Sequence, residues 1–160
     1  MLKKALEVLW RRAPKSVRRL SISLLHPRFM VSAGAVVFDD SGRVLLLNHV
    51  FRTGSGWGIP GGFLARGEQP EDALRRELRE EIGLEIESAE FVFARTIRAP
   101  AQVEIIFRCR LQKGASAPAP RSIEIKCIEW FTPNHLPRGL TSAQRRIINR
   151  VLSDKPNAPD

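Results

Sequence analysis

Apolar and β-branched residues fall into several short runs bounded by turn-forming residues, which is the pattern of β-strands. The run at residues 30–38 is followed by the turn sequence DDSG at 39–42 and by a second run at 43–51, so we predict a β-hairpin. In a later run, apolar side chains alternate with charged ones, which predicts a strand that buries one face. The later predicted strands are residues 84–98, 102–111 (the alternating run) and 122–131.

Residues 70–83 have the spacing of an amphipathic helix. Pro70 suits the first helical position because its missing N–H is not needed there. Glu71 and Asp72 place negative charge in the first turn, where the helix dipole favours it. Gly83 is a natural C-terminal stop. The apolar side of this helix is expected to consist of Ala73, Leu74, Leu78 and Ile82.

A second helix is predicted at residues 141–153, where Thr141 or Ser142 can cap the first turn. The segment KGASAPAPR at residues 113–121 predicts a mobile loop. A mixed sheet with one helix on each side makes an α/β/α sandwich, so α/β is the predicted fold class. Residues 154–160 are expected to form a disordered tail.

The N-terminal segment predicts two short helices, at residues 2–12 and 15–25, interrupted at Pro14. An apolar stripe beside basic residues fits a helix that binds a membrane surface or a partner. We favour the alternative, an extension packed on its own domain or on a second subunit, because amphipathic helices usually cover a core. The chain therefore divides into a basic helical extension at residues 1–29 and one domain at residues 30–153.

Composition narrows the classes of protein. The 160 residues suffice for one domain with a buried core. A net charge of +9 attracts anionic ligands such as nucleotides, RNA ends or an acidic membrane face. No apolar run reaches transmembrane length and the N-terminus has no secretory signal, so we expect a cytoplasmic protein. Cys109 and Cys127 lie singly in apolar runs, which predicts small buried hydrophobic residues rather than a zinc site.

The most informative stretch is residues 62–84, where nine positions follow the pattern G-x5-E-x7-R-E-L-x-E-E-x-G-L. Glu77, Glu80 and Glu81 are spaced i, i+3 and i+4, which puts three carboxylates on one side of the predicted helix. Crowded carboxylates raise each other's pKa unless a cation lies among them. Oxygen ligands of this kind suit Mg²⁺, Mn²⁺ or Ca²⁺.

A solvated helix face laced with arginines would explain RRELREE by itself, but not Gly62, Glu68 and Gly83 in the same register. The complete pattern resembles the Nudix box, the signature of hydrolases that cleave a nucleoside diphosphate linked to another moiety. The preceding WGIPGG at residues 57–62 is also similar to this family. The resemblance covers residues 30–152 and implies a Nudix-type α/β/α sandwich with a mixed sheet.

The resemblance implies water attack on a phosphorus of the diphosphate, with Mg²⁺ or Mn²⁺ neutralising the developing charge. By position, Glu77 and Glu81 are implied to be direct metal ligands, with Glu80 at a third ligand position. Glu68 is implied to be a supporting carboxylate. Arg76 is implied to orient a catalytic glutamate through an ion pair, although a surface pairing role explains it equally well.

Two further groups outside the box helix are candidates for the site. The Gly62 carbonyl can approach an ion closely because glycine carries no side chain. A carboxylate from elsewhere serves as base or extra ligand in members of this family, and Glu124 is our candidate. Glu104 comes second and Glu129 third, and a solvated strand position is the alternative for each. The identity of the general base stays open.

Substrate choice is expected to come from residues outside the box. Phe51, Arg52 and Arg98 are candidates for stacking on a base or holding a phosphate. Pro100, sixteen residues after Leu84, resembles the ADP-ribose pyrophosphatase subgroup, although the flanking residues differ. The chain has no tyrosine, which disfavours the diadenosine polyphosphate subgroup.

The favoured function is therefore hydrolysis of ADP-ribose or a nucleotide sugar, followed by nucleoside triphosphates. An RNA 5′-end pyrophosphohydrolase and a non-catalytic nucleotide-sensing module are the alternatives. A homodimer stays open, as does contact of the basic N-terminus with nucleic acid or a membrane.

Overall fold

A mixed β-sheet lies at the centre of the chain, between two helices on opposite faces. We describe it from a computed structural model that covers residues 2–52, 54–112 and 114–154. The strands are β1 (Met30–Phe38), β2 (Val44–His49), β3 (Trp57–Gly58), β4 (Gly61–Phe63), β5 (Ile86–Ile97), β6 (Gln102–Leu111) and β7 (Ile125–Phe131). The helices are α1 (Leu2–Arg12), α2 (Lys15–Leu25), α3 (Pro70–Ile82) and α4 (Ser142–Ser153), with a 3₁₀ turn, η1, at Pro133–His135.

The strand order is β3-β2-β1-β6-β5, with β4 also paired to β1 and β7 to β2. The strand β1 runs parallel to β6 along its whole length, from Met30 opposite Gln102 to Phe38 opposite Arg110. On its other edge, β1 pairs antiparallel with β4 near its start and with β2 at Phe38. Because β2 leaves β1 after that point, the beginning of β1 is free to receive the glycines of β4.

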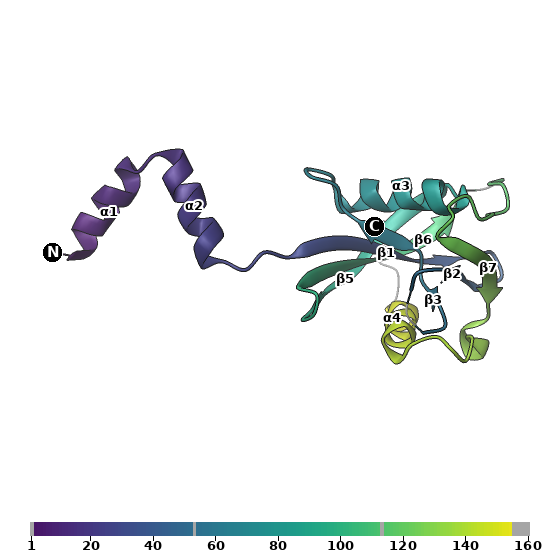
Figure 1. The fold of residues 1–160 in the computed structure, drawn as a ribbon. Coiled ribbons are helices and arrows are strands. Elements are labelled where there is room, and N and C mark those ends of the chain that lie inside the picture. Colours follow the sequence, from purple (N-terminus) through teal and green to yellow (C-terminus); the bar gives the residue numbers. More distant parts are fainter. Residues whose placement is uncertain (1, 53, 113, 155–160) are drawn as a thin grey trace.

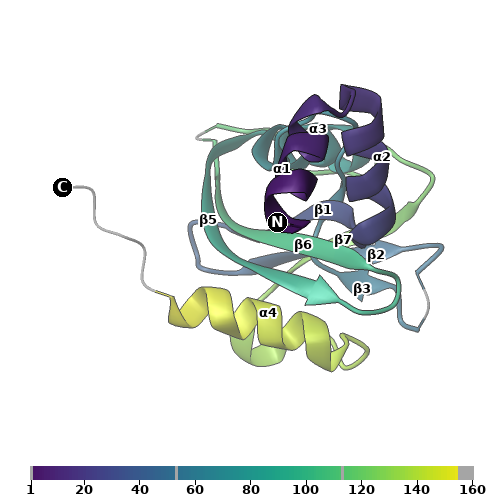
Figure 2. The same cartoon turned by 90° about the vertical axis from the view of Figure 1, so that its left-hand side faces the viewer.

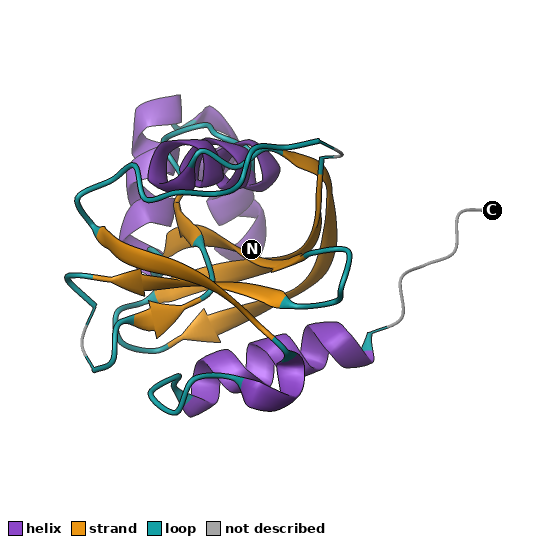
Figure 3. Cartoon of the chain, turned by 90° about the vertical axis from the view of Figure 1, so that its right-hand side faces the viewer, coloured by secondary structure: helices purple, strands orange, loops and turns teal. Residues whose placement is uncertain are grey.

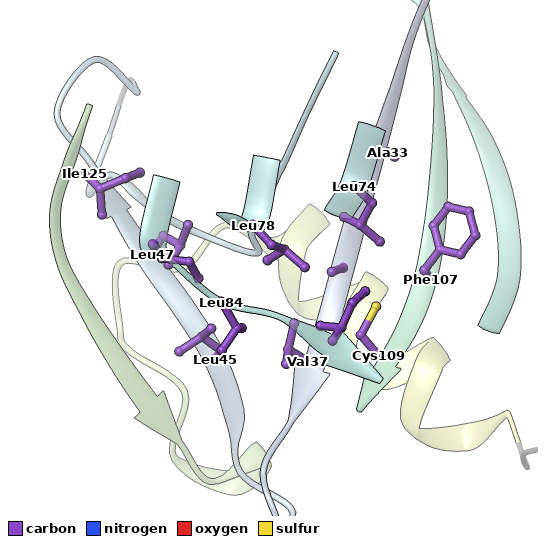
Figure 4. Packing of buried hydrophobic residues seen from close by; sticks show 13 residues of the cluster. Ala33, Val37, Leu45, Leu47, Leu74, Leu78, Leu84, Phe107, Cys109 and Ile125 are labelled. Carbon is purple, nitrogen blue, oxygen red and sulfur yellow. The ribbon is translucent and has the colours of Figure 1, made fainter. Parts of the chain in front are cut away.

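Both faces of the sheet are covered, which explains the continuous apolar runs of β1 and β2. On one face, Leu74 and Leu78 of α3 pack on alternate strand residues such as Val37 and Leu45 (Figure 4). On the other face, α4 packs on the intervening positions, including Val36 and Leu46.

The helices α3 and α4 lie on opposite sides of the sheet (Figure 1), and the colouring by secondary structure shows the same three layers (Figure 3). This arrangement confirms the predicted α/β/α sandwich. The box helix and the C-terminal helix occur where the pattern predicts them, apart from one residue at an end.

The predicted hairpin of β1 and β2 is confirmed, although it is paired only at its closed end because β4 occupies the edge of β1 beyond it. Two other predictions need correction. The strand β6 does not have one solvated face: Arg108 is 9% exposed, and its guanidinium donates to the Val151 carbonyl of α4. Cys109 is fully buried as predicted, whereas Cys127 is half-buried.

The connection before β7, predicted to be a mobile loop, is held in place by hydrogen bonds to helix α3. The N–H groups of Ala119 and Arg121 donate to the carbonyls of Ile82 and Glu81 at the C-terminal end of α3. Since the last carbonyls of a helix lack partners within it, this segment satisfies them. The strand itself begins at Ile125, three residues later than predicted.

The two N-terminal helices stand clear of the sheet and are joined to β1 by a short connection (Figure 1). In the view from that side, they lie in front of the body (Figure 2). We expected an extension packed on its own domain or on a second subunit; this arrangement does not have the first packing, and the second stays a prediction. None of the helices in the described ranges is long and apolar enough to cross a membrane. Most of the predicted C-terminal tail, residues 155–160, lies outside the described residues.

Candidate active site

The helix α3 begins and ends through local signals. Pro70 occupies the first turn, and Glu71 and Asp72 place their charges beside the unpaired N–H groups there. The C-cap Gly83 adopts the left-handed conformation with φ 68°, which a residue with a side chain rarely takes. These ends set which side chains face the sheet, and Glu81 belongs to the buried set with Leu74 and Leu78.

The three box carboxylates of α3 differ in their surroundings. Glu81 is 8% exposed, the Glu77 side chain is 18% exposed and that of Glu80 is 62% exposed. The three carboxylates, spaced i, i+3 and i+4, are therefore distributed from the buried side of the helix to its solvent-exposed side. Glu77 and Glu81 lie on the protein side, and Glu80 lies on the solvent side.

Arg76 connects the box carboxylates. Its guanidinium binds Glu68 through two parallel hydrogen bonds, with Nε 2.8 Å from Oε1 and Nη2 3.0 Å from Oε2. Its Nη1 donates to Glu77 Oε1 at 2.8 Å and, more weakly, to Glu80 Oε2 at 3.4 Å. The Arg76 hydrogen bond, followed by that from the Ala65 N–H, lowers the pKa of Glu68 to about 2. Glu68 is thus a permanent anion that holds Arg76 against Glu77.

Glu81 is a buried carboxylate with unused binding capacity. Its Oε2 is buried and has no hydrogen-bond partner among the described residues. Burial raises the pKa of Glu81 to about 7, the negative charges of Glu77 and Glu124 add to this, and the positive charge of Arg52 opposes it. A backbone hydrogen bond from Gly61 favours the charged form, but the buried Oε2 without a partner is costly, so its retention points to a ligand.

The glycines of β4 bring main chain up to this carboxylate pair. Gly61 has φ 144° and lies against the Ala33 carbonyl, so a side chain there would collide with β1. A Cβ at Gly62 would collide with the Glu77 carboxylate. The Gly62 main chain and the Glu77 carboxylate therefore lie directly against each other, and the Gly62 carbonyl as a metal ligand stays a prediction.

A cavity of about 240 Å³ opens beside Gly62, between β1, β6 and the start of α4. Its polar lining comes from Ser32, Arg52, Gln102, Glu104 and Gln144. The guanidinium of Arg52 lies over Gly58, where a side chain would collide with it. Burial lowers the pKa of Arg52, while the charges of Glu81 and Glu104 raise it, so this cation of the cavity lining interacts with carboxylates of both α3 and β6.

The candidate carboxylates outside α3 occupy different places. Glu124, just before β7, is close enough to Glu81 to raise its pKa. Glu104 lines the cavity and pairs with Arg95 at 2.5 Å. Glu129 is an exposed residue of β7.

The substrate candidates are also separated. Among the described residues, the cavity lining includes Arg52 but not Phe51, Arg98 or Pro100. Phe51 is 73% exposed. Arg98 and Pro100 are exposed residues of the turn between β5 and β6.

Sequence reasoning missed three polar residues of the cavity. Gln102 Nε2 donates to Ser32 Oγ at 2.6 Å, and Gln144 Oε1 accepts from the Ile59 N–H at 3.1 Å. Ser32 interrupts an apolar strand and could have been noticed for that reason. Gln102 and Gln144 begin a strand and a helix, where polar residues are ordinary.

The residues fit a divalent cation chemically, although no group of three metal-ligating side chains is assembled within the described part of the chain. Glu77 and Glu81 supply hard oxygen ligands of the kind that Mg²⁺ and Mn²⁺ prefer, beside the Gly62 main chain. The unpartnered Glu81 Oε2 and the mutual repulsion of Glu77 and Glu81 both favour a cation there.

Comparison with known proteins agrees with this fold. The sequence matches the NUDIX domain over residues 28–151. The chain therefore belongs to the Nudix hydrolase family, a class of pyrophosphohydrolases that act on acid anhydrides in phosphorus-containing compounds.

Individual relatives define the extent of the similarity. A MutT-like protein of Streptomyces ambofaciens is 34% identical over 113 residues, which cover 69% of this chain and 68% of that protein. The NAD-capped RNA hydrolase NudC of Pseudomonas aeruginosa is 28% identical over 129 residues, covering 80% of this chain and 45% of NudC. This chain thus spans about half the length of NudC. The crystal structure of a MutT Nudix hydrolase from Burkholderia pseudomallei is 27% identical with a TM-score of 0.65, covering 78% of this chain and 99% of that one.

Proposed function

We propose that this protein is a Mg²⁺- or Mn²⁺-dependent hydrolase that cleaves the diphosphate of a nucleoside diphosphate linked to another moiety. The observation that carries the proposal is the buried, unpartnered carboxylate oxygen of Glu81 beside Glu77 and Gly62. Gly62 also lines a polar cavity together with Arg52, whose positive charge acts on Glu81. A cation site next to a phosphate-binding arginine is the arrangement that phosphoryl transfer requires.

The division of labour follows from the contacts. Glu77 and Glu81 would hold the metal, with the Gly62 carbonyl as a main-chain ligand and Glu80 on the solvent side. When bound, the metal would neutralise charge on the diphosphate and lower the pKa of a water. Arg76, fixed by Glu68, keeps the Glu77 carboxylate in place.

Glu124 is proposed as the group that receives a proton from the attacking water. It lies close enough to Glu81 for its negative charge to raise the pKa of Glu81. Glu104 is the second candidate, since it lines the cavity. It ranks second because its carboxylate is already engaged in an ion pair with Arg95.

The cavity size bears on the substrate. About 240 Å³ is small for a whole dinucleotide, since ligand pockets usually measure ~300–1,000 Å³. The cavity suits one half of such a substrate, with the diphosphate at Arg52 and Gly62 and the other half over the open rim. ADP-ribose or a nucleotide sugar fits this division, and nucleoside triphosphates come next.

A capped or triphosphorylated RNA 5′ end is the second candidate. NudC, which is 28% identical, is named a NAD-capped RNA hydrolase. The net charge of +9 would also attract a polyanion. A nucleotide-sensing module without turnover is disfavoured by the complete set of box residues. The cytoplasmic location stays a prediction.

The test is product release with Mg²⁺ and with Mn²⁺ from ADP-ribose, a nucleotide sugar, a nucleoside triphosphate, 5′-triphosphate RNA and NAD-capped RNA. We expect turnover that chelator abolishes, and a preference for ADP-ribose or the nucleotide sugar. The Glu81→Gln variant should lose on the order of 10²–10³-fold in kcat. Glu129→Gln, on an exposed strand position, is the matched control and should keep wild-type activity.

Two outcomes would contradict the proposal. Metal-independent hydrolysis would remove the carboxylate site from the mechanism. Tight binding of every compound without turnover would assign the protein to nucleotide sensing. A preference for either RNA would keep the chemistry and replace the substrate class.

A further inference from the structure

The N-terminal arm, which we define as residues 2–29, carries most of the net charge of the protein. It has eight basic residues and one acidic residue, Glu7, which gives +7 out of the +9 of the whole chain and leaves +2 for the rest. Glu7 is itself paired with Arg11 at 2.9 Å. The arm is therefore a concentrated cationic segment attached to a body of nearly balanced charge.

The same arm exposes large apolar side chains. On α2, Val17, Leu20 and Leu24 are spaced i, i+3 and i+7 and are 51%, 61% and 76% exposed. This spacing forms a stripe along one side of the helix, and the basic residues of α2 lie toward the other side. On α1, Leu9 and Trp10 are 70% and 46% exposed. An exposed apolar patch of this size is unusual on a surface that has no binding partner.

The exposed apolar surface continues from the arm onto the body. Phe29 and Met30 are each 45% exposed where the arm meets β1, and Phe63 of β4 is 53% exposed. These three residues line one open groove of about 420 Å³. The apolar surface is therefore continuous at the root of the arm, although the arm itself stands clear of the sheet (Figure 1).

We propose that the N-terminal arm binds the protein to an anionic lipid surface. In this arrangement, the stripe of Val17, Leu20 and Leu24 and the side chain of Trp10 enter the interface, and the arm's lysines and arginines contact lipid phosphates. Long basic side chains can reach a headgroup while their stems cover apolar surface. The proposal is independent of which phosphoanhydride the body hydrolyses.

Charge distinguishes a lipid surface from other occupants. Two arms of +7 each repel one another, and the body at +2 has no net negative charge to attract the arm. A nucleic acid would satisfy the charge but not the aliphatic stripe, because bases stack on aromatic side chains rather than on leucine or valine. An anionic membrane satisfies both the charge and the apolar surface.

Flotation of the full chain with vesicles tests the proposal directly. We expect binding to vesicles of equimolar phosphatidylcholine and phosphatidylglycerol, weaker binding at high salt, and none to phosphatidylcholine alone. Tryptophan emission should shift to the blue on binding, and this shift should be lost in Trp10→Phe. The other two tryptophans, Trp57 and Trp130, are half-buried in the body and should contribute little.

Charge and apolar variants separate the two parts of the proposal. The triple variant Lys15→Ser, Arg18→Ser, Arg19→Ser should bind anionic vesicles on the order of 10²–10³-fold more weakly. A matched triple variant removes three exposed basic residues of the body and should bind within a few-fold of wild type: Lys126→Ser, Arg138→Ser and Arg146→Ser. The double variant Leu20→Asp, Leu24→Asp should lose vesicle binding. All of these proteins should hydrolyse a small substrate in solution as wild type does, which also shows that the body is folded.

Four results would overturn the proposal. One is the absence of binding to anionic vesicles at low salt, and another is equal weakening by the arm and body triple variants. A third is binding of an RNA oligonucleotide, without vesicle binding, that the arm triple variant abolishes. The fourth is a dimer that the Leu20→Asp, Leu24→Asp variant dissociates, again without vesicle binding.

Discussion

The carboxylate of Glu77 lies in the space that a side chain at Gly62 would occupy. Helix α3 therefore approaches strand β4 so closely that a proposed metal ligand touches the main chain of that strand. This contact explains in physical terms why a glycine stands fifteen residues before the glutamate. It also makes Gly62 a sensitive position for testing the site.

Replacing Gly62 by Ala should displace Glu77 and reduce kcat/KM on the order of 10²-fold, because small misplacements of catalytic groups are costly. Gly42→Ala is the control: Gly42 has φ 72° with open space around it. That variant should lose ~1 kcal/mol of stability and keep its activity. Steady-state kinetics and thermal unfolding of both proteins measure this. Equal activity of Gly62→Ala and wild type would contradict the contact.

Arg76→Lys should weaken the site, because lysine cannot make the two parallel hydrogen bonds to Glu68. We expect activity to fall ~10–100-fold and half-maximal activity to require more Mg²⁺. Arg79→Lys is matched, since Arg79 lies on the same helix and pairs with Glu85 at 2.7 Å away from the site. A metal titration of both variants measures the effect, and identical curves would assign Arg76 a surface role.

Arg52→Gln should raise KM for a diphosphate substrate by ~10–100-fold, the loss expected for a hydrogen bond to a charged group. Arg52 lines the cavity, and its positive charge acts on Glu81. Arg98→Gln, in the exposed turn between β5 and β6, should leave KM unchanged. If Arg98→Gln raised KM and Arg52→Gln did not, the substrate would lie at that turn instead.

The free energy of unfolding should decrease as the pH is lowered, because His49 becomes protonated. Its Nε2 is buried without a hydrogen-bond partner among the described residues, and burial, followed by the charge of Arg52, lowers its pKa to about 4 from 6.5. As the pH falls, the unfolded chain therefore binds a proton first. The stabilisation is present above pH 6.5 and is lost toward pH 4, by up to ~1 kcal/mol per pH unit.

Urea denaturation above and below this window measures the effect. His49→Gln should show a smaller loss of unfolding free energy on acidification than wild type. His135→Gln, at an exposed position, should show the wild-type loss. The same loss in all three proteins would assign the acid sensitivity to other groups.

The two cysteines should differ in reactivity. Burial raises the pKa of Cys109 to about 12, so only ~10⁻⁴ of this thiol is ionised near pH ~8. Cys127 is half-buried on β7. Iodoacetamide should label Cys127 in the native protein and Cys109 only after unfolding, as peptide mass spectrometry would show. Rapid native labelling of Cys109 in a Cys127→Ser variant would contradict its burial.

The box helix shows how much of the candidate site was available from sequence. The prediction of residues 70–83 matches α3 and its C-cap because Pro70 and Gly83 act within one turn of the chain. The same local geometry places Glu77 and Glu81 one turn apart. Their different burial was not predictable, because it depends on how the helix packs on β1 and β2.

The sheet shows where sequence reasoning stopped. The strand β1 pairs in parallel with β6, which lies about seventy residues away in the sequence. The sequence of neither strand identifies the other as its partner. In the sequence, Arg108 resembles a solvated strand residue, but in the structure α4 covers that face of the sheet and buries it. Likewise, the segment 114–121 resembles a mobile loop in the sequence, but in the structure two of its N–H groups donate hydrogen bonds to carbonyls at the end of α3.

The sequence alone determined the elements with strong local signals, the family, and the position of the three box carboxylates on one helix. Helix ends, turns and side-chain spacing depend on neighbours along the chain, so they can be read from it. The tertiary structure decided which of those carboxylates is buried, that Arg52, Glu104 and Gln144 line one cavity, and that the arm leaves its apolar stripe uncovered. These features depend on contacts between residues far apart in the chain, which hydrophobic pattern and spacing do not specify.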